Sequence, residues 1–311
     1  MCRFSRRPWT PSRSLNWPLP SPAKAASASS TEEPYYPKGA VDGYVDDTAR
    51  WKSDGVAGPH TLTVELEVSS RVGSAHVYTG GRPFDPALPC VVFVHGALND
   101  HTVWTLLARW CAHHGHSVLA VDLPGHRRSA GPALDSVEAM ARWLLRLLDA
   151  AGVARAALCG HSMGSLVALE AASLAPDRAT HLVMFGTAYP MVVSPALLDL
   201  SRDAPQAAIE LVTSLSFSTL APKPGYPGPG VWLRGGGRAL SRLVLAGQGD
   251  HGLFHRDFTA CNDYRRGLEA AALVTAPATL VLGSRDQMTS PKTTADLAKA
   301  LKARIETVNA G

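Results

Sequence analysis

Short apolar runs alternate with helix-like segments from about residue 60 to the end of the 311-residue chain. Residues 61–68 alternate between apolar and polar side chains, which predicts an antiparallel or edge strand, and residues 74–78 are expected to pair with it. Continuous apolar runs, typical of strands buried on both faces, occupy residues 90–94, 117–121, 156–159, 181–185 and 278–282. This alternation predicts an α/β fold with a mostly parallel central sheet and helices on both of its faces.

The segments between these runs carry helix signals. After residues 90–94, Asn99 and Asp100 are candidate N-caps. The helix that follows has five apolar side chains on one face, as in an amphipathic helix: Val103, Leu106, Leu107, Trp110 and Cys111. Asp135 and Glu138 have the spacing of a capping box. Further helices are predicted at residues 165–175, near 258–273, and at 291–302 with Ser290 as its cap.

The alternation is interrupted between residues 190 and 257 by helical pieces and a segment rich in Pro and Gly. We interpret residues 190–257 as a helical cap inserted into a core formed by residues 46–189 and 258–311. The core ends with a predicted strand at residues 304–308. Residues 1–45 are expected to lie outside the fold.

Charge separates a basic tail from a nearly neutral body. Of 30 basic and 26 acidic residues, five basic and no acidic ones lie in residues 1–31, so the remainder carries 25 basic and 26 acidic residues. This balance gives no reason to expect nucleic acid or anionic lipid as a partner. We interpret the Ser- and Pro-rich tail as a disordered extension, with a transit peptide and a start codon placed too far upstream as alternatives.

Two further features bear on the location of the protein. No stretch of about 18 unbroken apolar residues is present, so no membrane span is expected. The five cysteines form no C-x-x-C pair, which indicates reduced, buried thiols in a reducing compartment. We therefore expect a cytoplasmic protein.

Residues 160–164 read Gly-His-Ser-Met-Gly, which is the pattern G-x-S-x-G, and they stand directly between a predicted buried strand and a predicted helix. A nucleophile elbow occupies this position, where a sharp turn lifts a serine hydroxyl above the sheet. Glycines two residues to either side permit close packing that a Cβ would prevent. Ser162 is therefore the candidate nucleophile.

An acyl-transfer serine also needs an oxyanion hole and a supporting acid. The backbone N–H groups of Met163 and of Ala97, in the loop after strand 90–94, are the candidate oxyanion donors. His95 is interpreted as a structural side chain that braces this loop. Asp286 follows the strand at 278–282 and is the candidate acid, since the strand at 181–185 ends without one.

These motifs follow one another in a characteristic order: His95-Gly96, Asp122-Leu-Pro-Gly125, the elbow at Ser162, and Asp286. From about residue 60 onward the chain thereby resembles the α/β-hydrolase superfamily, in its serine-nucleophile, esterase- and lipase-like branch with a helical cap. The resemblance implies an α/β-hydrolase fold and an acyl-enzyme mechanism. Arg127 is a minor departure, because the family often has a second glycine there in D-x-P-G-x-G-x-S.

The resemblance also implies a histidine base in the loop after the last strand, and this is the major departure. No histidine follows Asp286, and the sequence stops at Gly311, one residue before the family would place its base. Two hypotheses stay open: a fragment of an ordinary hydrolase, or a complete chain that is a non-catalytic binding module or recruits another histidine. His251 and His255 are the candidates for recruitment. Together with Asp250 and Asp257 they are otherwise interpreted as surface polar residues at a helix edge, not as a metal site.

The expected activity is hydrolysis of a carboxylic ester with a small to medium apolar acyl group. Serine at the elbow disfavours haloalkane dehalogenase and epoxide hydrolase, which use Asp there. It leaves thioesterase, lactonase, carbon–carbon hydrolase, perhydrolase and acyltransferase as alternatives. Apolar cap residues are candidates for an acyl pocket: Met191, Val192, Val193, Leu197, Leu198, Leu211, Phe217 and Trp232. The expected partner is a small-molecule ester, and no cofactor or metal is predicted.

Overall fold

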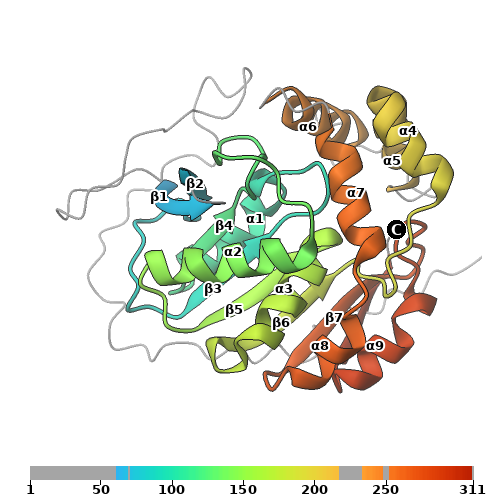
Figure 1. Cartoon of the computed structure of the whole chain (residues 1–311). Coiled ribbons are helices and arrows are strands. Elements are labelled where there is room, and N and C mark those ends of the chain that lie inside the picture. The colour runs from blue at the N-terminus through green and yellow to red at the C-terminus, as the bar shows by residue number, and fades with distance from the viewer. Residues whose placement is uncertain (1–60, 69–70, 217–232, 248–251, 310–311) are drawn as a thin grey trace, which may run out of the picture. The chain divides into compact units, whose positions relative to one another are not determined.

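A computed structural model describes residues 61–68, 71–216, 233–247 and 252–309, all within one compact unit that comprises residues 46–311. The predicted tail, His251, Phe217 and Trp232 lie outside the described residues. An eight-stranded sheet runs through the unit in the order β1-β2-β4-β3-β5-β6-β7-β8 (Figure 1). Its strands are β1 (Thr61–Val68), β2 (Arg71–Tyr78), β3 (Cys90–Val94), β4 (Ser117–Val121), β5 (Ala156–His161), β6 (Ala179–Phe185), β7 (Ala278–Gly283) and β8 (Arg304–Val308).

Among the described strands, only β2 runs against the direction of the others. β1 and β2 form an antiparallel hairpin, and β2 pairs antiparallel with β4 through Val77 and Tyr78. All other neighbouring strands are parallel. The side chains of β3 and β4 are buried along their whole length, as their continuous apolar sequences require. The predicted α/β-hydrolase fold with a mostly parallel sheet is therefore confirmed.

Helices connect the parallel strands, and α2, α3 and α8 lie in front of the sheet in Figure 1, with α1 behind it. The main apolar core lies between the sheet and α2, α3 and α8. No helix of the described segments is long and apolar enough to cross a bilayer. The helices are η2 (His101–Trp104), α1 (Thr105–His113), α2 (Val137–Ala150), α3 (Met163–Leu174), η3 (Pro176–Arg178), α4 (Pro195–Asp203), α5 (Pro205–Leu215), α6 (Leu233–Gly247), α7 (Leu253–Asp263), α8 (Gly267–Leu273), η4 (Pro291–Thr294) and α9 (Ala295–Ala300).

Several helix boundaries differ from the prediction. Asp100 does cap the first helical turn, since its carboxylate accepts from Thr102 N at 2.8 Å. Ser136, not Asp135, caps α2. The predicted helix at 258–273 is two helices, α7 and α8, and the helix at 291–302 is a 3₁₀ turn followed by α9. Ser290 makes no side-chain cap bond.

Of the five residues on the apolar face predicted for α1, only Cys111 is buried, and the four large ones are exposed. Leu106 and Trp110 are 68% and 51% exposed, whereas Ala108 and Cys111 are buried. The helix therefore contacts the sheet through small residues, and Trp104 of η2 fills the adjacent space against Phe93. The large apolar side chains of α1 point outward instead.

The segment between β6 and β7 holds α4, α5, α6 and α7, which lie together beyond one end of the sheet (Figure 1). Their buried apolar side chains form a second cluster, separate from the main core, that includes Leu197, Ile209 and Phe254. Leu98, in the loop after β3, belongs to the same cluster. These helices therefore pack directly against a loop that lies beside the candidate nucleophile.

Candidate active site

Ser162 occupies a strained turn between β5 and α3. Its φ of 51° and ψ of −121° lie in a region that residues other than glycine rarely adopt. A Cβ added to Gly160 would lie 2.0 Å from the carbonyl oxygen of Gly164, and one added to Gly164 would lie 2.3 Å from that of Val94. Both glycines of the G-x-S-x-G pattern are therefore needed for the turn to pack against the sheet.

Hydrogen bonds on both sides hold this turn in place. Ser162 N donates to the carbonyl oxygen of Phe185 at 3.0 Å. The N–H and hydroxyl of Ser165 donate to the carbonyl oxygen of Ser162 at 2.8 and 2.5 Å. Met163 is the first residue of α3, so its N–H has no acceptor within the helix. The helix N-terminus thus presents partial positive charge next to Ser162.

The loop after β3 lies against the same turn. A Cβ added to Gly96 would lie 3.2 Å from the Cβ of Ser162 and 3.1 Å from Nδ1 of His161. This contact places Ala97, the next residue, beside Ser162. The two predicted oxyanion donors therefore come from two elements, the loop after β3 and the N-terminus of α3, that meet at Ser162.

Side-chain hydrogen bonds hold the residues on both sides of Ala97. His95 is fully buried, its Nδ1 donates to the carbonyl oxygen of Gly96 at 2.8 Å, and its Nε2 accepts from Leu123 N at 3.1 Å. Burial lowers the pKa of His95 to about 4, so the ring is neutral at pH 7 and can make this donor–acceptor pair. The bracing role predicted for His95 agrees with these bonds.

Asp257 of α7 holds the other side of Ala97. Its Oδ2 accepts from Leu98 N at 2.8 Å and from His126 Nε2 at 2.9 Å, and both side chains are buried. Burial alone would lower the pKa of His126, but the charge and hydrogen bond of Asp257 outweigh it, so the pKa is raised. The prediction that Asp257 lies at a polar surface is wrong, because its carboxylate binds a backbone amide 159 positions away.

Asp286 directly follows β7, and its carboxylate is ordered by its own turn. Oδ1 accepts from the N–H groups of Met288 and Thr289, both at 2.8 Å, and Oδ2 accepts from the Thr289 hydroxyl at 2.7 Å. A Cβ added to Gly186, after β6, would lie 3.5 Å both from Nε2 of His161 and from Oγ1 of Thr289. The acidic turn and the elbow therefore meet at the same end of the sheet.

The hydrogen bonds of the described residues link no histidine to the Ser162 hydroxyl or to the Asp286 carboxylate. His255, a predicted candidate for recruitment, lies on α7, and its Nδ1 contacts the carbonyl oxygen of Leu198 at 3.0 Å and the Ser201 hydroxyl at 3.3 Å. It therefore joins α7 to α4 and does not face the elbow.

The apolar cap residues predicted to line an acyl pocket lie in different environments: the main core, the second cluster and the surface. Met191 belongs to the main core and Leu197 to the second cluster. Val192 is 73% exposed. Val193 and Leu198 are partly buried beside the second cluster, where Leu98 also packs. Of the predicted lining, these two residues fit an acyl site best.

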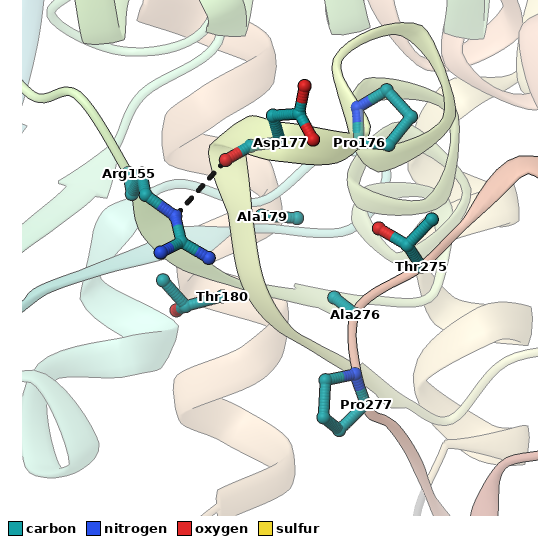
Figure 2. A pocket seen from close by; sticks show the side chains of 8 residues that line it. All are labelled: Arg155, Pro176, Asp177, Ala179, Thr180, Thr275, Ala276 and Pro277. Atoms are coloured by element: carbon teal, nitrogen blue, oxygen red, sulfur yellow. Dashed lines mark hydrogen bonds between the residues drawn. The ribbon is translucent and has the colours of Figure 1, made fainter.

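An open hollow of about 490 Å³ lies at the opposite end of the parallel strands. Residues that precede or begin β5, β6 and β7 line it, among them Arg155, Ala179 and Pro277. Figure 2 shows the Arg155 side chain hydrogen-bonded to the backbone of Asp177, at 3.1 Å. The hollow is therefore remote from Ser162 and takes no part in the candidate site.

Comparison with known proteins agrees with this architecture. A family model described as alpha/beta hydrolase fold matches residues 89–213. The chain is 32% identical over 140 residues to an sn-1-specific diacylglycerol lipase of Mus musculus, covering 42% of this chain and 46% of that protein. It is also 32% identical over 131 residues to an epoxide hydrolase of Caballeronia sordidicola, covering 41% and 38%. The chain spans less than half the length of the curated relatives it matches.

Solved structures share the fold over a larger part of the chain. The enol-lactonase from Burkholderia xenovorans LB400 superposes with a TM-score of 0.65 at 22% identity, over 77% of this chain and 89% of that one. An esterase from Exiguobacterium antarcticum superposes with a TM-score of 0.66 at 16% identity, over 80% and 91%. The family model and the solved structures agree with an α/β-hydrolase fold for this chain.

Proposed function

We propose that the protein is a serine hydrolase that cleaves a carboxylic ester of a small to medium apolar acyl group. The observation that carries the proposal is the strained turn at Ser162, which lies against the Gly96–Ala97 loop and at the N-terminus of α3. Strain of this kind persists only where the surroundings enforce it, and it is concentrated at functional sites. An exposed turn with an ordinary role would not require two flanking glycines and a braced loop.

In the proposed mechanism, the Ser162 hydroxyl attacks the ester carbonyl carbon and transfers its proton to a base. The N–H groups of Ala97 and Met163 donate to the oxyanion, and each such donor contributes about 10²–10³-fold to the rate. The alcohol leaves with the proton, and water then hydrolyses the acyl-enzyme. In this proposal Asp286 orients a histidine base, and the end of β8 lies beside the Asp286 turn, since Ser284 N donates to Val308 O at 2.9 Å.

A second candidate is a binding module with the same fold and no catalysis. The observation in its favour is that, among the described residues, no histidine is hydrogen-bonded to Ser162 or Asp286. A serine hydroxyl without a base is a weak nucleophile at neutral pH. The two candidates differ in whether Ser162 reacts covalently, because a pocket that only binds has no activated hydroxyl. Thioesterase, lactonase and the other serine activities share the covalent step with the esterase.

Covalent labelling with a fluorophosphonate, together with hydrolysis of p-nitrophenyl acetate, tests the proposal. Both are measured with and without added imidazole, which can act as an external base. We expect wild type and the control Ser214→Ala, an exposed serine on α5, to react, and Ser162→Ala to show only the background of imidazole alone. Equal labelling of wild type and Ser162→Ala would overturn the assignment. Ligand binding without any labelling of Ser162 would favour the binding module.

A further inference from the structure

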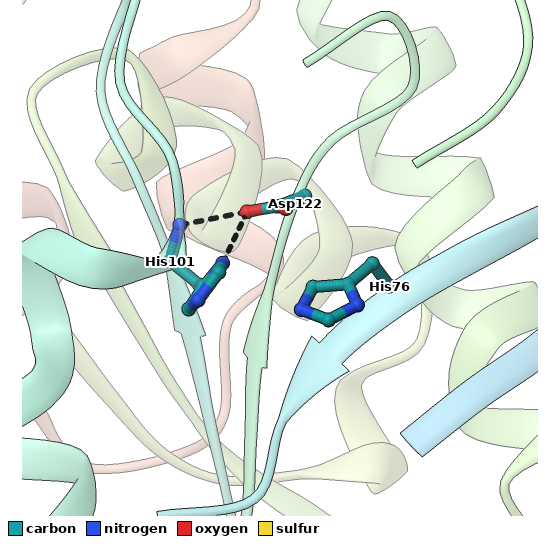
Figure 3. Close-up of side chains that lie close together, drawn as sticks. All are labelled: His76, His101 and Asp122. Atoms are coloured by element: carbon teal, nitrogen blue, oxygen red, sulfur yellow. Dashed lines mark hydrogen bonds and ion pairs between the residues drawn. The ribbon is translucent and has the colours of Figure 1, made fainter. Parts of the chain in front are cut away.

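A cluster of buried ligand-type side chains lies at the junction between the β1–β2 hairpin and the rest of the sheet. His76 is in β2, His101 begins η2, and Asp122 directly follows β4. The three residues are 6%, 7% and 0% exposed, and one potential ligand atom from each lies within 4.8 Å of the others. Figure 3 shows the His76 ring turned toward His101 and Asp122.

One atom of this cluster is unpaired. Nε2 of His76 is buried and has no hydrogen-bond partner, although its backbone N–H donates to the Ser129 hydroxyl at 2.9 Å. A buried polar atom without a partner costs about 1–3 kcal/mol. His101 is in contrast well placed, since its Nδ1 lies 2.7 Å from Asp122 Oδ1 and its ring centroid lies 5.0 Å from that of His76. Packing alone therefore does not explain the orientation of the His76 ring.

We propose that His76, His101 and Asp122 form a binding site for one divalent transition-metal ion, with Zn²⁺ the best match. Two imidazole nitrogens and one carboxylate oxygen are a donor set that zinc prefers, with a water molecule as the fourth ligand. In tetrahedral geometry the ligand atoms are about 3.4 Å apart. In the structure the three ligand atoms lie within 4.8 Å of one another.

The protonation states of His76 and Asp122 suit metal binding. Burial lowers the pKa of His76 to about 4, so its ring is neutral at pH 7 and its lone pair is free to bind metal. The carboxylates of Asp122 and Asp100 raise the pKa of His76, and the nearby His101 and Arg128 lower it. Asp122 is held in its ionised form by His101, which lowers its pKa against the effect of burial.

The position of the site indicates a structural role. Within the described part of the chain, the hairpin is joined to β4 through the pairs at Val77 and Tyr78, and to the segment after β4 through bonds from Asp122 N to His76 O, at 3.0 Å, and from His76 N to the Ser129 hydroxyl, at 2.9 Å. A metal bound by a residue of β2 and by residues at the ends of β4 and at η2 would fasten this junction. The proposal is independent of the chemistry at Ser162, because the cluster contains none of the residues placed in that site.

The test uses full-length protein treated with a chelator and then titrated with Co²⁺ or Zn²⁺. We expect one equivalent of Co²⁺ to give the intense visible absorption of a tetrahedral site, and Zn²⁺ in about 100-fold excess over its Kd to raise Tm by roughly 5 °C or more. His76→Gln and His101→Gln should each lower the affinity at least about 10-fold. The control His114→Gln, an exposed histidine after α1, should bind as wild type does.

Two results would overturn the proposal. The first is wild-type protein that shows no Co²⁺ absorption and no Tm rise at millimolar metal. The second is metal binding of equal affinity and stoichiometry in wild type and in both cluster variants. Circular dichroism of the metal-free variants establishes that they are folded, and the wild-type titration decides the question even if one of them is not.

Discussion

The carboxylate of Asp257 connects the helices beyond the sheet to the loop that carries Ala97. Its hydrogen bond to Leu98 N and its ion pair with His126 are both buried, where such bonds are strong and sensitive to charge. Asp257 does not touch the position of the reacting atoms. If the Ala97 N–H is an oxyanion donor, as proposed, Asp257 is a positioning residue that acts through it.

If the proposed mechanism is right, Asp257→Asn should reduce kcat by about 10-fold or more with little change in KM. Asn can still accept from Leu98 N, but it removes the carboxylate that pairs with His126, so the loop is held less firmly. Because Asp257 raises the pKa of His126, any pH dependence of kcat that follows this histidine should shift to lower pH in the variant. The control is Asp263→Asn, an exposed acid at the end of the same helix. A change in KM alone would contradict a positioning role.

The sequence predicted the parts of the site that depend on local pattern. Gly160, Ser162 and Gly164 are recognisable because a strand, a strained turn and a helix must follow one another within a few residues. Asp257 could not be found in this way, because its partner Leu98 is 159 positions away and a single acid on a polar helix looks the same whether buried or exposed. The one sequence feature that could have pointed to a buried partner for Asp257 was His126, which follows Asp122-Leu-Pro-Gly125 and bonds to its carboxylate.

Among the larger elements, the strands were predicted well and the helices less well. A strand buried on both faces needs a continuous apolar run, and few other elements produce one. An apolar stripe on a helix does not show which face meets the core. In α1 the small residues Ala108 and Cys111 lie against the sheet and the large ones point outward. Close approach of the helix to the sheet explains the difference, because bulky side chains would hold the two apart.

This arrangement predicts effects of very different size for similar substitutions in two helices. Leu144→Ala in α2 removes a fully buried side chain and should lower the free energy of unfolding by about 2–5 kcal/mol. Leu106→Ala in α1 removes a side chain that is 68% exposed and should change it by less than about 0.5 kcal/mol. Urea unfolding of both variants measures the difference. A large loss in Leu106→Ala would show that the face of α1 is covered in solution.

The molecule as a whole contains several buried histidines, and they make its stability depend on pH. Burial lowers the pKa of His95 and of His76 to about 4, whereas an unfolded histidine has a pKa of about 6.5. Below pH 6.5 the unfolded state binds protons that the folded state does not, so the free energy of unfolding decreases as the pH is lowered. The decrease ends near pH 4, where the two histidines titrate in the folded state as well. His126 contributes with the opposite sign, because its raised pKa favours the folded state in acid.

We therefore expect metal-free protein to lose about 3 kcal/mol of stability through His95 alone between pH 7 and pH 4. His126, Asp122 and Asp100 surround this ring, and the burial of His95 outweighs the two carboxylates. Replacing His95 with Asn lowers stability at pH 7, since the bond to Leu123 N is lost, but it should also make the fall toward pH 4 smaller by about that amount. Urea unfolding at pH 7, 5.5 and 4 measures both slopes, with the exposed His113→Gln as the matched control. Parallel curves for wild type and His95→Asn would show that the buried ring is not the group that titrates, and acid sensitivity would then have to arise from the carboxylates.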